Sequence, residues 1–480
     1  MLAVRVLAAV AASAAISTTV AGPLIPPAGS PSPTYKTLQQ VEPRGDINAI
    51  NPLGAFDHPI FVAGSYYLTD NINSSSTYQI GVLTDNIVID LNGFTIDGQD
   101  AAAACILVNF PGGSVTIRNG TLVGSKALAI EVSNPNTTRV VLEDVTVKEC
   151  VGGVQLGFGG SMLRCLVSGI TGNTPAIVGA SDVTVRETSV AGINAVGMNL
   201  GDRATVQHVR VRSTGGVGIL AGTEARIEGA TVTDAGDSAI FTGDRANVRD
   251  VVVLNPGDRG VSVGARSTVT NAVVDGANAT GILTGAGSRI EGSVAENCSA
   301  DGITAGSDNV IVNCIARGNG DDGIESSGSS VIENCVANFN VDEGIFVGTG
   351  SIVRGCTAAQ NDSIGILAGF SSNIQSCTVY NNGSHGIQIN GDSTVRFCQA
   401  DNNGRLTSSG AGIRNIGSGT VIDSCGATDN DEGIFAVNDT LVMRCFADGN
   451  GTDYLIAPGM PVTPIANLST AGPFDNIEGF

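Results

Sequence analysis

The chain has 480 residues, of which 42% are apolar and only 4% aromatic, with 65 glycines and no tryptophan. Its formal net charge of −21 at pH 7 argues against a nucleic acid or an anionic membrane surface as partner, and a polyanion would need a bridging cation. The abundance of Val, Ile, Thr, Ser, Asn and Gly favours short strands and tight turns over helices.

Residues 1–21 carry one Arg, then a short apolar run, then small residues. This order is typical of a secretory signal peptide, with cleavage expected after Ala21. The alternatives are a buried helix or a retained anchor. The apolar run is short for a transmembrane helix, and no later segment is long and apolar enough to be one. The Pro-rich stretch at 22–34 predicts an extended linker.

Residues 64–451 contain a repeat of 21 residues. A small residue followed by an apolar one recurs at this spacing, as in Gly302-Ile303, Gly323-Ile324 and Gly344-Ile345, and five extra residues before Gly412-Ile413 interrupt it. Apolar residues twelve and fourteen positions after the glycine show the two-residue alternation of a strand. Asn recurs seventeen positions after the glycine, as at Asn319, Asn340, Asn361, Asn382, Asn403 and Asn450.

This pattern predicts an all-β fold, a single-stranded parallel β-helix of about 21 residues per coil whose equivalent strands pair about 4.8 Å apart. We expect the Asn column in a turn, where the side chains bond along the stack and tolerate unusual backbone angles. A leucine-rich repeat has a similar period but requires a Leu-rich pattern and a helical segment. Because such a stack has unpaired edges at its ends, we expect caps at 35–63 and 452–480 and no second domain.

Several stretches resemble secreted bacterial right-handed parallel β-helix repeat proteins of the pectate-lyase-like superfamily, in an uncharacterised branch. They are the ladders over 176–450 together with NIVIDLNGFTIDG (86–98) and VTIRNGTLVG (115–124). The stretches at 64–72 and 458–480 resemble the ends of secreted members. The resemblance implies the right hand of the helix. The scaffold carries lyases, hydrolases, epimerases, adhesins and binding proteins, so it implies no single activity.

The sequence has eleven cysteines. The sequence contains no Cys-x-x-Cys spacing and no His in the main Cys column, which argues against a metal site. Disulfides between adjacent coils would strain the parallel geometry. We therefore expect a stack of buried thiols that behave as small apolar residues. Six of them share one inward column: Cys314, Cys335, Cys356, Cys377, Cys398 and Cys445.

Acidic residues occupy the turn before Gly-Ile in neighbouring coils: Asp321 and Asp322, then Asp342 and Glu343, with His385 in the same column two coils further on. Carboxylates on adjacent coils would lie about 5 Å apart at their Cα atoms, where each raises the pKa of the other or recruits a cation. Three interpretations stay open. The column can be a hydrated turn without a ligand, or a Ca²⁺ site. Alternatively, its acids, together with His385, can act as the general acid and the base or nucleophile of glycoside hydrolysis.

Two enzyme families offer comparisons for this column. The Gly-Asp-Asp at 320–322 and His385-Gly386 resemble elements of polygalacturonase-like hydrolases, which lie about one coil apart in that family, whereas three coils separate them here. A polysaccharide lyase needs a basic residue to remove a proton, for which Arg354 and Arg396 are candidates. The alternative for Arg354 is a surface ladder in which it pairs with Glu333.

Outward residues of the C-terminal half predict a substrate-binding face. The position after Gly-Ile should point outward and holds Phe346, Gln388, Arg414 and Phe435, and Tyr380 lies near the insertion at 402–413. The sequence thus predicts a secreted β-helix protein that binds or processes extracellular or cell-envelope polysaccharide. The alternatives are a non-catalytic structural or adhesive surface rod, and a Ca²⁺-dependent polysaccharide lyase or glycoside hydrolase.

Overall fold

The computed structural model describes residues 44–457, 465–466 and 475–478. The expected signal peptide and linker at 1–34 lie outside the described residues. So do residues 35–43 of the expected N-terminal cap and most of the expected C-terminal cap.

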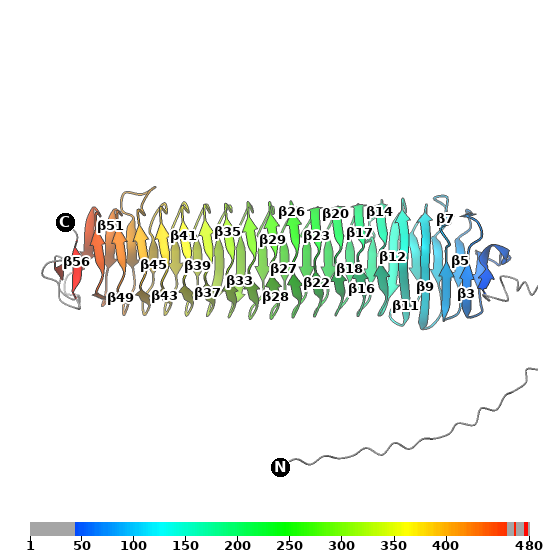
Figure 1. Cartoon of the computed structure of the whole chain (residues 1–480), viewed down its shortest axis with the longest axis horizontal. Coiled ribbons are helices and arrows are strands. Elements are labelled where there is room, and N and C mark those ends of the chain that lie inside the picture. The colour runs from blue at the N-terminus through cyan, green and yellow to red at the C-terminus, as the bar shows by residue number, and fades with distance from the viewer. Residues whose placement is uncertain (1–43, 458–464, 467–474, 479–480) are drawn as a thin grey trace, which may run out of the picture. The chain divides into compact units, whose positions relative to one another are not determined.

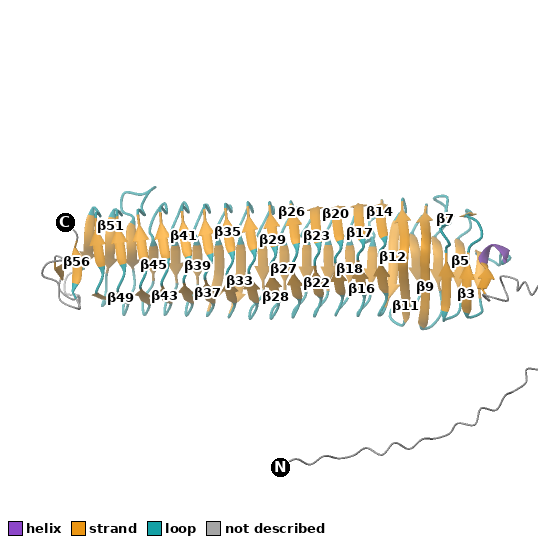
Figure 2. Cartoon of the chain, in the orientation of Figure 1, coloured by secondary structure: helices purple, strands orange, loops and turns teal. Residues whose placement is uncertain are grey.

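Residues 44–478, where described, form one parallel β-solenoid (Figures 1 and 2). Each regular coil contributes three strands, and each strand pairs in parallel with its equivalent in the next coil. The register follows the repeat, since Ile303 pairs with Ile324 and Ile324 pairs with Ile345. The parallel β-helix predicted from the sequence is confirmed, because equivalent residues stack directly on one another.

The three strands of each coil define three faces, which we name A, B and C. In the C-terminal half, face A consists of β33 (Ile303–Ser307), β36 (Ile324–Gly328), β39 (Ile345–Val347), β42 (Ile366–Ala368), β45 (Ile387–Ile389), β48 (Ala411–Asn415) and β51 (Glu432–Ala436). Face B consists of β34 (Val310–Val312), β37 (Val331–Glu333), β40 (Ile352–Arg354), β43 (Asn373–Gln375), β46 (Thr394–Arg396), β49 (Val421–Asp423) and β52 (Leu441–Met443). Face C consists of β35 (Ile315–Arg317), β38 (Val336–Asn338), β41 (Thr357–Ala359), β44 (Thr378–Tyr380), β47 (Gln399–Asp401), β50 (Gly426–Thr428) and β53 (Phe446–Asp448).

The N-terminal coils have longer strands, such as β9 (Gly113–Val123) and β11 (Thr138–Lys148). Parallel pairing already includes β1 (Arg44–Asp46), which pairs with β3 (Gly64–Tyr67). It therefore extends into the range that we expected to be a cap. A short 3₁₀ helix, η1 (Ile47–Ala49), follows β1. The described residues contain no helix that is long and apolar enough to span a membrane.

One continuous core fills the solenoid from end to end. Face A contributes fully buried isoleucines such as Ile324 and Ile345, and faces B and C contribute Ile332, Ala337 and their equivalents. Side chains alternate between the core and the surface along most of the regular strands, such as β37 and β38, as the two-residue period of a strand requires. Burying aliphatic side chains of this size stabilises a fold by about 1.5–3 kcal/mol each.

The Asn column forms a buried ladder along the turn between faces C and A. The side-chain Oδ1 of Asn361 accepts two hydrogen bonds from Asn340, one from its backbone N–H at 3.1 Å and one from the Nδ2–H of Asn340 at 2.9 Å. Asn382 and Asn403 continue this pattern. The predicted hydrogen bonding along the stack is thus confirmed. The ladder continues to Asn430 and Asn450.

The expectation that these Asn residues adopt unusual backbone angles is wrong. The left-handed conformation falls one residue earlier in the turn, at Phe339 (φ 60°), Gln360 (φ 57°) and Asn381 (φ 58°). The chain bends at that position, and the bend directs the following Asn side chain into the interior, where it bonds to the neighbouring coil.

All eleven cysteines are buried and none forms a disulfide. The Sγ of Cys335 accepts the backbone N–H of Cys314 at 3.4 Å and lies 3.3 Å from the carbonyl oxygen of Glu333, to which its thiol donates. The predicted stack of buried thiols is confirmed, and the structure adds that each thiol is also a weak hydrogen-bonding group at a corner of the coil.

Candidate functional site

We use the name acidic edge for Asp301, Asp321, Asp322, Asp342 and Glu343, which lie in the turns that precede β33, β36 and β39. Asp322 is only 8% exposed, whereas Asp321 is exposed. One carboxylate oxygen from each of Asp321, Asp322 and Asp342 lies within 4.8 Å of the other two. The stacking of consecutive coils therefore brings together the acids that the sequence singled out.

Hydrogen bonds of the acidic edge run from one coil to the next. The backbone N–H of Asp322 donates to Oδ1 of Asp301 at 3.1 Å, and the backbone N–H of Glu343 donates to Oδ1 of Asp322 at 2.9 Å. Ser363 donates its hydroxyl to Oε1 of Glu343 at 3.2 Å. Asp322 and Glu343 thus each use one oxygen to hold a neighbouring turn in place, whereas both oxygens of Asp301 accept hydrogen bonds, since Thr304 donates its hydroxyl to Oδ2 at 2.6 Å.

The acids raise one another's pKa. Burial, followed by the neighbouring Glu343, raises the pKa of Asp322 to about 9. Burial, followed by Asp301 and Asp342, raises the pKa of Asp321, and burial together with Asp342 raises the pKa of Glu343. Within the described part of the chain, no Lys or Arg forms an ion pair with these acids. A proton or a cation is therefore favourable at this edge.

His385 lies in the same column but away from the acidic edge. It precedes β45, three coils after β36, which corresponds to about 14 Å along the axis. The backbone N–H of Ala411 donates to its Nδ1 at 2.9 Å, and Nη1 of Arg414 lies 2.5 Å from its Nε2. Burial, followed by the charge of Arg414, lowers the pKa of His385 to about 4. With this pKa, His385 is neutral at pH 7. The separation of about 14 Å is too long for His385 and Asp322 to contact the same reacting atom.

The expected binding face divides into two parts. Phe346, Gln388, Arg414 and Phe435 are partly exposed on face A, as predicted, and the Arg414 guanidinium lies 5.4 Å from the centre of the Phe435 ring. Tyr380 instead belongs to β44 on face C, where it pairs with Ala359 and Asp401. Its position fifteen residues after the glycine places it on a different strand, so it is not part of the face A column.

The five extra residues produce a loop at 402–410, between β47 and β48, which protrudes from the stack near β45 in Figure 1. Arg405 in this loop reaches back to earlier coils and pairs with Asp362 at 2.8 Å. The interruption of the repeat marks this loop in the sequence, but the sequence did not identify Arg405 or its partner. Arg405 and Asp362 line a depression of about 360 Å³ together with Phe339, Gln360 and Asn381.

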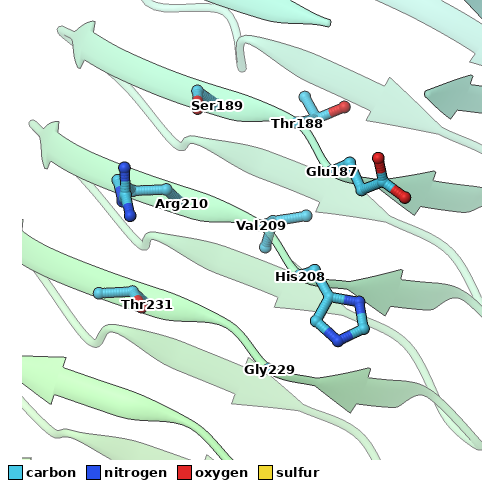
Figure 3. Close-up of a pocket in the computed structure, with 8 residues that line it drawn as sticks. All are labelled: Glu187, Thr188, Ser189, His208, Val209, Arg210, Gly229 and Thr231. Carbon is cyan, nitrogen blue, oxygen red and sulfur yellow. The ribbon is translucent and has the colours of Figure 1, made fainter. Parts of the chain in front are cut away.

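A second depression, of about 400 Å³, lies at the corner between faces B and C in the N-terminal half (Figure 3). Glu187 and His208 line one side of it on successive coils, and Ser189 and Arg210 line the other side. His208 has a left-handed backbone (φ 52°) at this corner. His208 therefore lies on a corner other than that of the acidic edge.

Comparisons with known proteins agree with this architecture. Residues 128–275, 194–373 and 343–456 match the protein family described as "right handed beta helix region". No curated protein matches this sequence.

Solved structures give weak overall superpositions. The A-module of a mannuronan C-5 epimerase from Azotobacter vinelandii is 12% identical, with 74% of this chain and 91% of that chain covered and a TM-score of 0.34. A periplasmic alginate epimerase is 10% identical, with coverage of 75% and 76% and a TM-score of 0.25. The Dettilon tailspike protein is 12% identical, with coverage of 82% and 62% and a TM-score of 0.26. The family match spans most of the solenoid, and the chain belongs to the right-handed parallel β-helix family.

Proposed function

We propose that this protein binds an extracellular or cell-envelope polysaccharide, and that the acidic edge holds Ca²⁺ at Asp321, Asp322 and Asp342, with Glu343 beside them. The observation that carries the proposal is the approach of three carboxylate oxygens to within 4.8 Å of one another. Ca²⁺ is a hard cation that takes six to eight oxygen ligands. It would offset the repulsion that raises the pKa values of these acids, and water or sugar hydroxyls would complete its coordination.

The face beside this edge supports a polymeric ligand. Partly exposed side chains follow one another along face A at Phe346, Gln388, Arg414 and Phe435. Their spacing is set by coils about 4.8 Å apart, so a linear chain can contact several of them in succession. An anionic polysaccharide meets a protein of formal charge −21, and a bound cation would bridge the two.

Binding is favoured over catalysis by the positions of the charged groups. One carboxylate oxygen from each of the three aspartates lies within 4.8 Å of the other two, so these groups can share a single cation as ligands. The two candidate lyase bases are engaged elsewhere, since Arg354 pairs with Glu333 at 2.7 Å and Arg396 lies 3.6 Å from Asp423. A hydrolase or lyase activity therefore remains the second candidate.

The first experiment is a calorimetric titration of the protein with CaCl₂ at pH 7, in two buffers of different ionisation enthalpy. We expect binding that releases a proton, because the raised pKa keeps Asp322 protonated before Ca²⁺ arrives. The Asp322→Asn/Asp342→Asn variant should lose the binding. The control variant Asp234→Asn/Asp250→Asn removes the same charge at positions in earlier coils, outside the acidic edge, and should keep it. Absence of binding heat at millimolar Ca²⁺, or equal binding by both variants, would remove the metal site from the proposal.

The second experiment measures co-sedimentation with polysaccharides that stay insoluble without Ca²⁺, in Ca²⁺ and in EGTA. Retention that requires Ca²⁺ and the intact acidic edge supports the proposed function. Absence of retention on every polysaccharide, by a protein that binds Ca²⁺, would favour the non-catalytic surface rod.

A further inference from the structure

The loop at 402–410 supplies one wall of a pocket whose other walls belong to regular coils. Its lining residues come from four successive turns between faces C and A: Phe339, Gln360 and Asp362, Asn381, and Arg405. We name this depression the loop pocket. Its volume of about 360 Å³ lies within the range of about 300–1,000 Å³ that small-molecule sites occupy.

Arg405 forms a fixed wall of the loop pocket. Its Nε donates to the carbonyl oxygen of Asn381 at 3.1 Å, and its Nη2 donates to the carbonyl oxygen of Asn361 at 3.3 Å and to Oδ1 of Asp362 at 2.8 Å. The next residue, Leu406, donates its backbone N–H to the carbonyl oxygen of Gly383 at 2.8 Å. The loop is thus attached to coils that precede it by up to 44 residues, and the guanidinium plane is held in one orientation.

The chemistry of the lining suits a sugar. The Phe339 ring is 52% exposed, and an aromatic ring of this kind can pack against the apolar face of a pyranose. Gln360 carries an amide that both donates and accepts hydrogen bonds, as the hydroxyl groups of a sugar require. The Oδ1 of Asn381 already accepts the Nδ2–H of Asn402 at 2.6 Å, so Asn381 offers a sugar chiefly the donors of its own Nδ2. Arg405 and Asp362 neutralise each other in an ion pair, so the pocket has no net charge and gives no preference to an anionic ligand.

We propose that the loop pocket binds a single uncharged pyranose residue of a polysaccharide. The inference rests on the proposed function, since it names a sugar class and a second contact point for the same kind of ligand. It differs in location and mechanism, because binding in the pocket needs neither Ca²⁺ nor the acidic edge.

Exposure of Phe339 is not by itself unusual in this protein. Phe397 is 54% exposed and has a left-handed backbone (φ 56°) very close to that of Phe339 (φ 60°). Phe397 lies at the corner between faces B and C and does not line the loop pocket. It therefore provides a control variant that is matched in exposure, side chain and backbone conformation.

The experiment is saturation-transfer difference NMR with maltohexaose, cellohexaose and mannohexaose, recorded in EDTA on the full chain. We expect transfer to the ring protons of at least one hexasaccharide. Its affinity should fall at least tenfold in Phe339→Ala and in Arg405→Ala, and should stay within twofold in Phe397→Ala and in Asp322→Asn/Asp342→Asn. Circular dichroism spectra and melting temperatures of all variants would confirm that the solenoid is intact.

Two results of the measurements in EDTA would overturn the loop pocket. One is the absence of transfer to all three hexasaccharides. The other is binding that Phe339→Ala and Phe397→Ala weaken equally. The same measurement repeated in CaCl₂ separates the two sites. Binding that appears only with Ca²⁺ and disappears only in Asp322→Asn/Asp342→Asn would be a third result that overturns the pocket, while it would support the proposed function of the acidic edge.

Discussion

Replacing Asn361 by Ala tests whether the buried Asn ladder holds the turns of the acidic edge together. The Asn361 side chain is fully buried. Its Oδ1 accepts two hydrogen bonds from Asn340, and its Nδ2 donates to the carbonyl oxygen of Ala337 at 3.1 Å and to Oδ1 of Asn382 at 2.9 Å. The substitution removes all four bonds without breaking the backbone pairing of the coil.

The expected loss follows from the donors that are left without an acceptor. Asn340 loses the acceptor of its backbone N–H and of one Nδ2 hydrogen, while its Nδ2 keeps the 3.4 Å contact with Ala316. Asn382 keeps the backbone N–H of Asn361 as a donor at 3.1 Å. Each buried unsatisfied donor costs about 1–3 kcal/mol, so two donors give a loss of about 2–6 kcal/mol. A water molecule that enters the vacated space would bring the loss to the lower end.

The assay is urea denaturation followed by circular dichroism, combined with hydrogen exchange of peptides that contain β38 and β41. Faster exchange should be concentrated in these strands, because each coil of a solenoid contacts only its neighbours. The control is Asn373→Ala on the surface of β43, where we expect a change within about 0.5 kcal/mol. A loss for Asn361→Ala that is within about 1 kcal/mol of this control would refute the reasoning.

Four further predictions concern charge and thiols. The folded state keeps a proton on Asp322 that the unfolded state releases, so stability should fall as the pH rises from about 4 to the folded pKa of about 9. Asp322→Asn should flatten this slope in melting temperatures measured at pH 5 and pH 9. Equal slopes for the variant and the unchanged protein would contradict the prediction. Arg414→Ala should raise the pKa of His385 from about 4, although burial, the larger cause, should keep this pKa below its usual value. An NMR titration of His385 that shows no rise would exclude a direct contact between Arg414 and His385. Arg354→Ala should cost less than about 1 kcal/mol in urea denaturation, because its ion pair with Glu333 is largely exposed; a larger loss would show that its side chain does more than pair at the surface. Ellman's reagent should react with none of the eleven buried thiols in the native protein and with all of them in guanidinium, whereas fast native reaction would mean that part of the stack opens.

The candidate site was predictable where it depends on the repeat. Asp322 and Asp342 are twenty residues apart in sequence but belong to turns that stack directly, because β36 pairs with β39 in register. The same rule predicted the partial exposure of Phe346 and the distance of three coils between Asp322 and His385. It could not show that the backbone N–H of Ala411 and the guanidinium of Arg414 contact both ring nitrogens of His385, because those residues follow the insertion.

The sequence by itself determined the strands, their register, the inward Cys ladder, the hydrogen bonding of the Asn ladder along the stack and the proximity of the acids. It did so because, in a solenoid, a position and its equivalent one period later are neighbours in space, so a one-dimensional period specifies the three-dimensional contact. Only the tertiary structure decided how the loop at 402–410 folds, that Arg405 returns to Asp362, and that a pocket lies between Arg405 and Phe339. A loop that interrupts the period has no equivalent to stack on, and its conformation depends on hydrogen bonds to particular atoms of earlier coils.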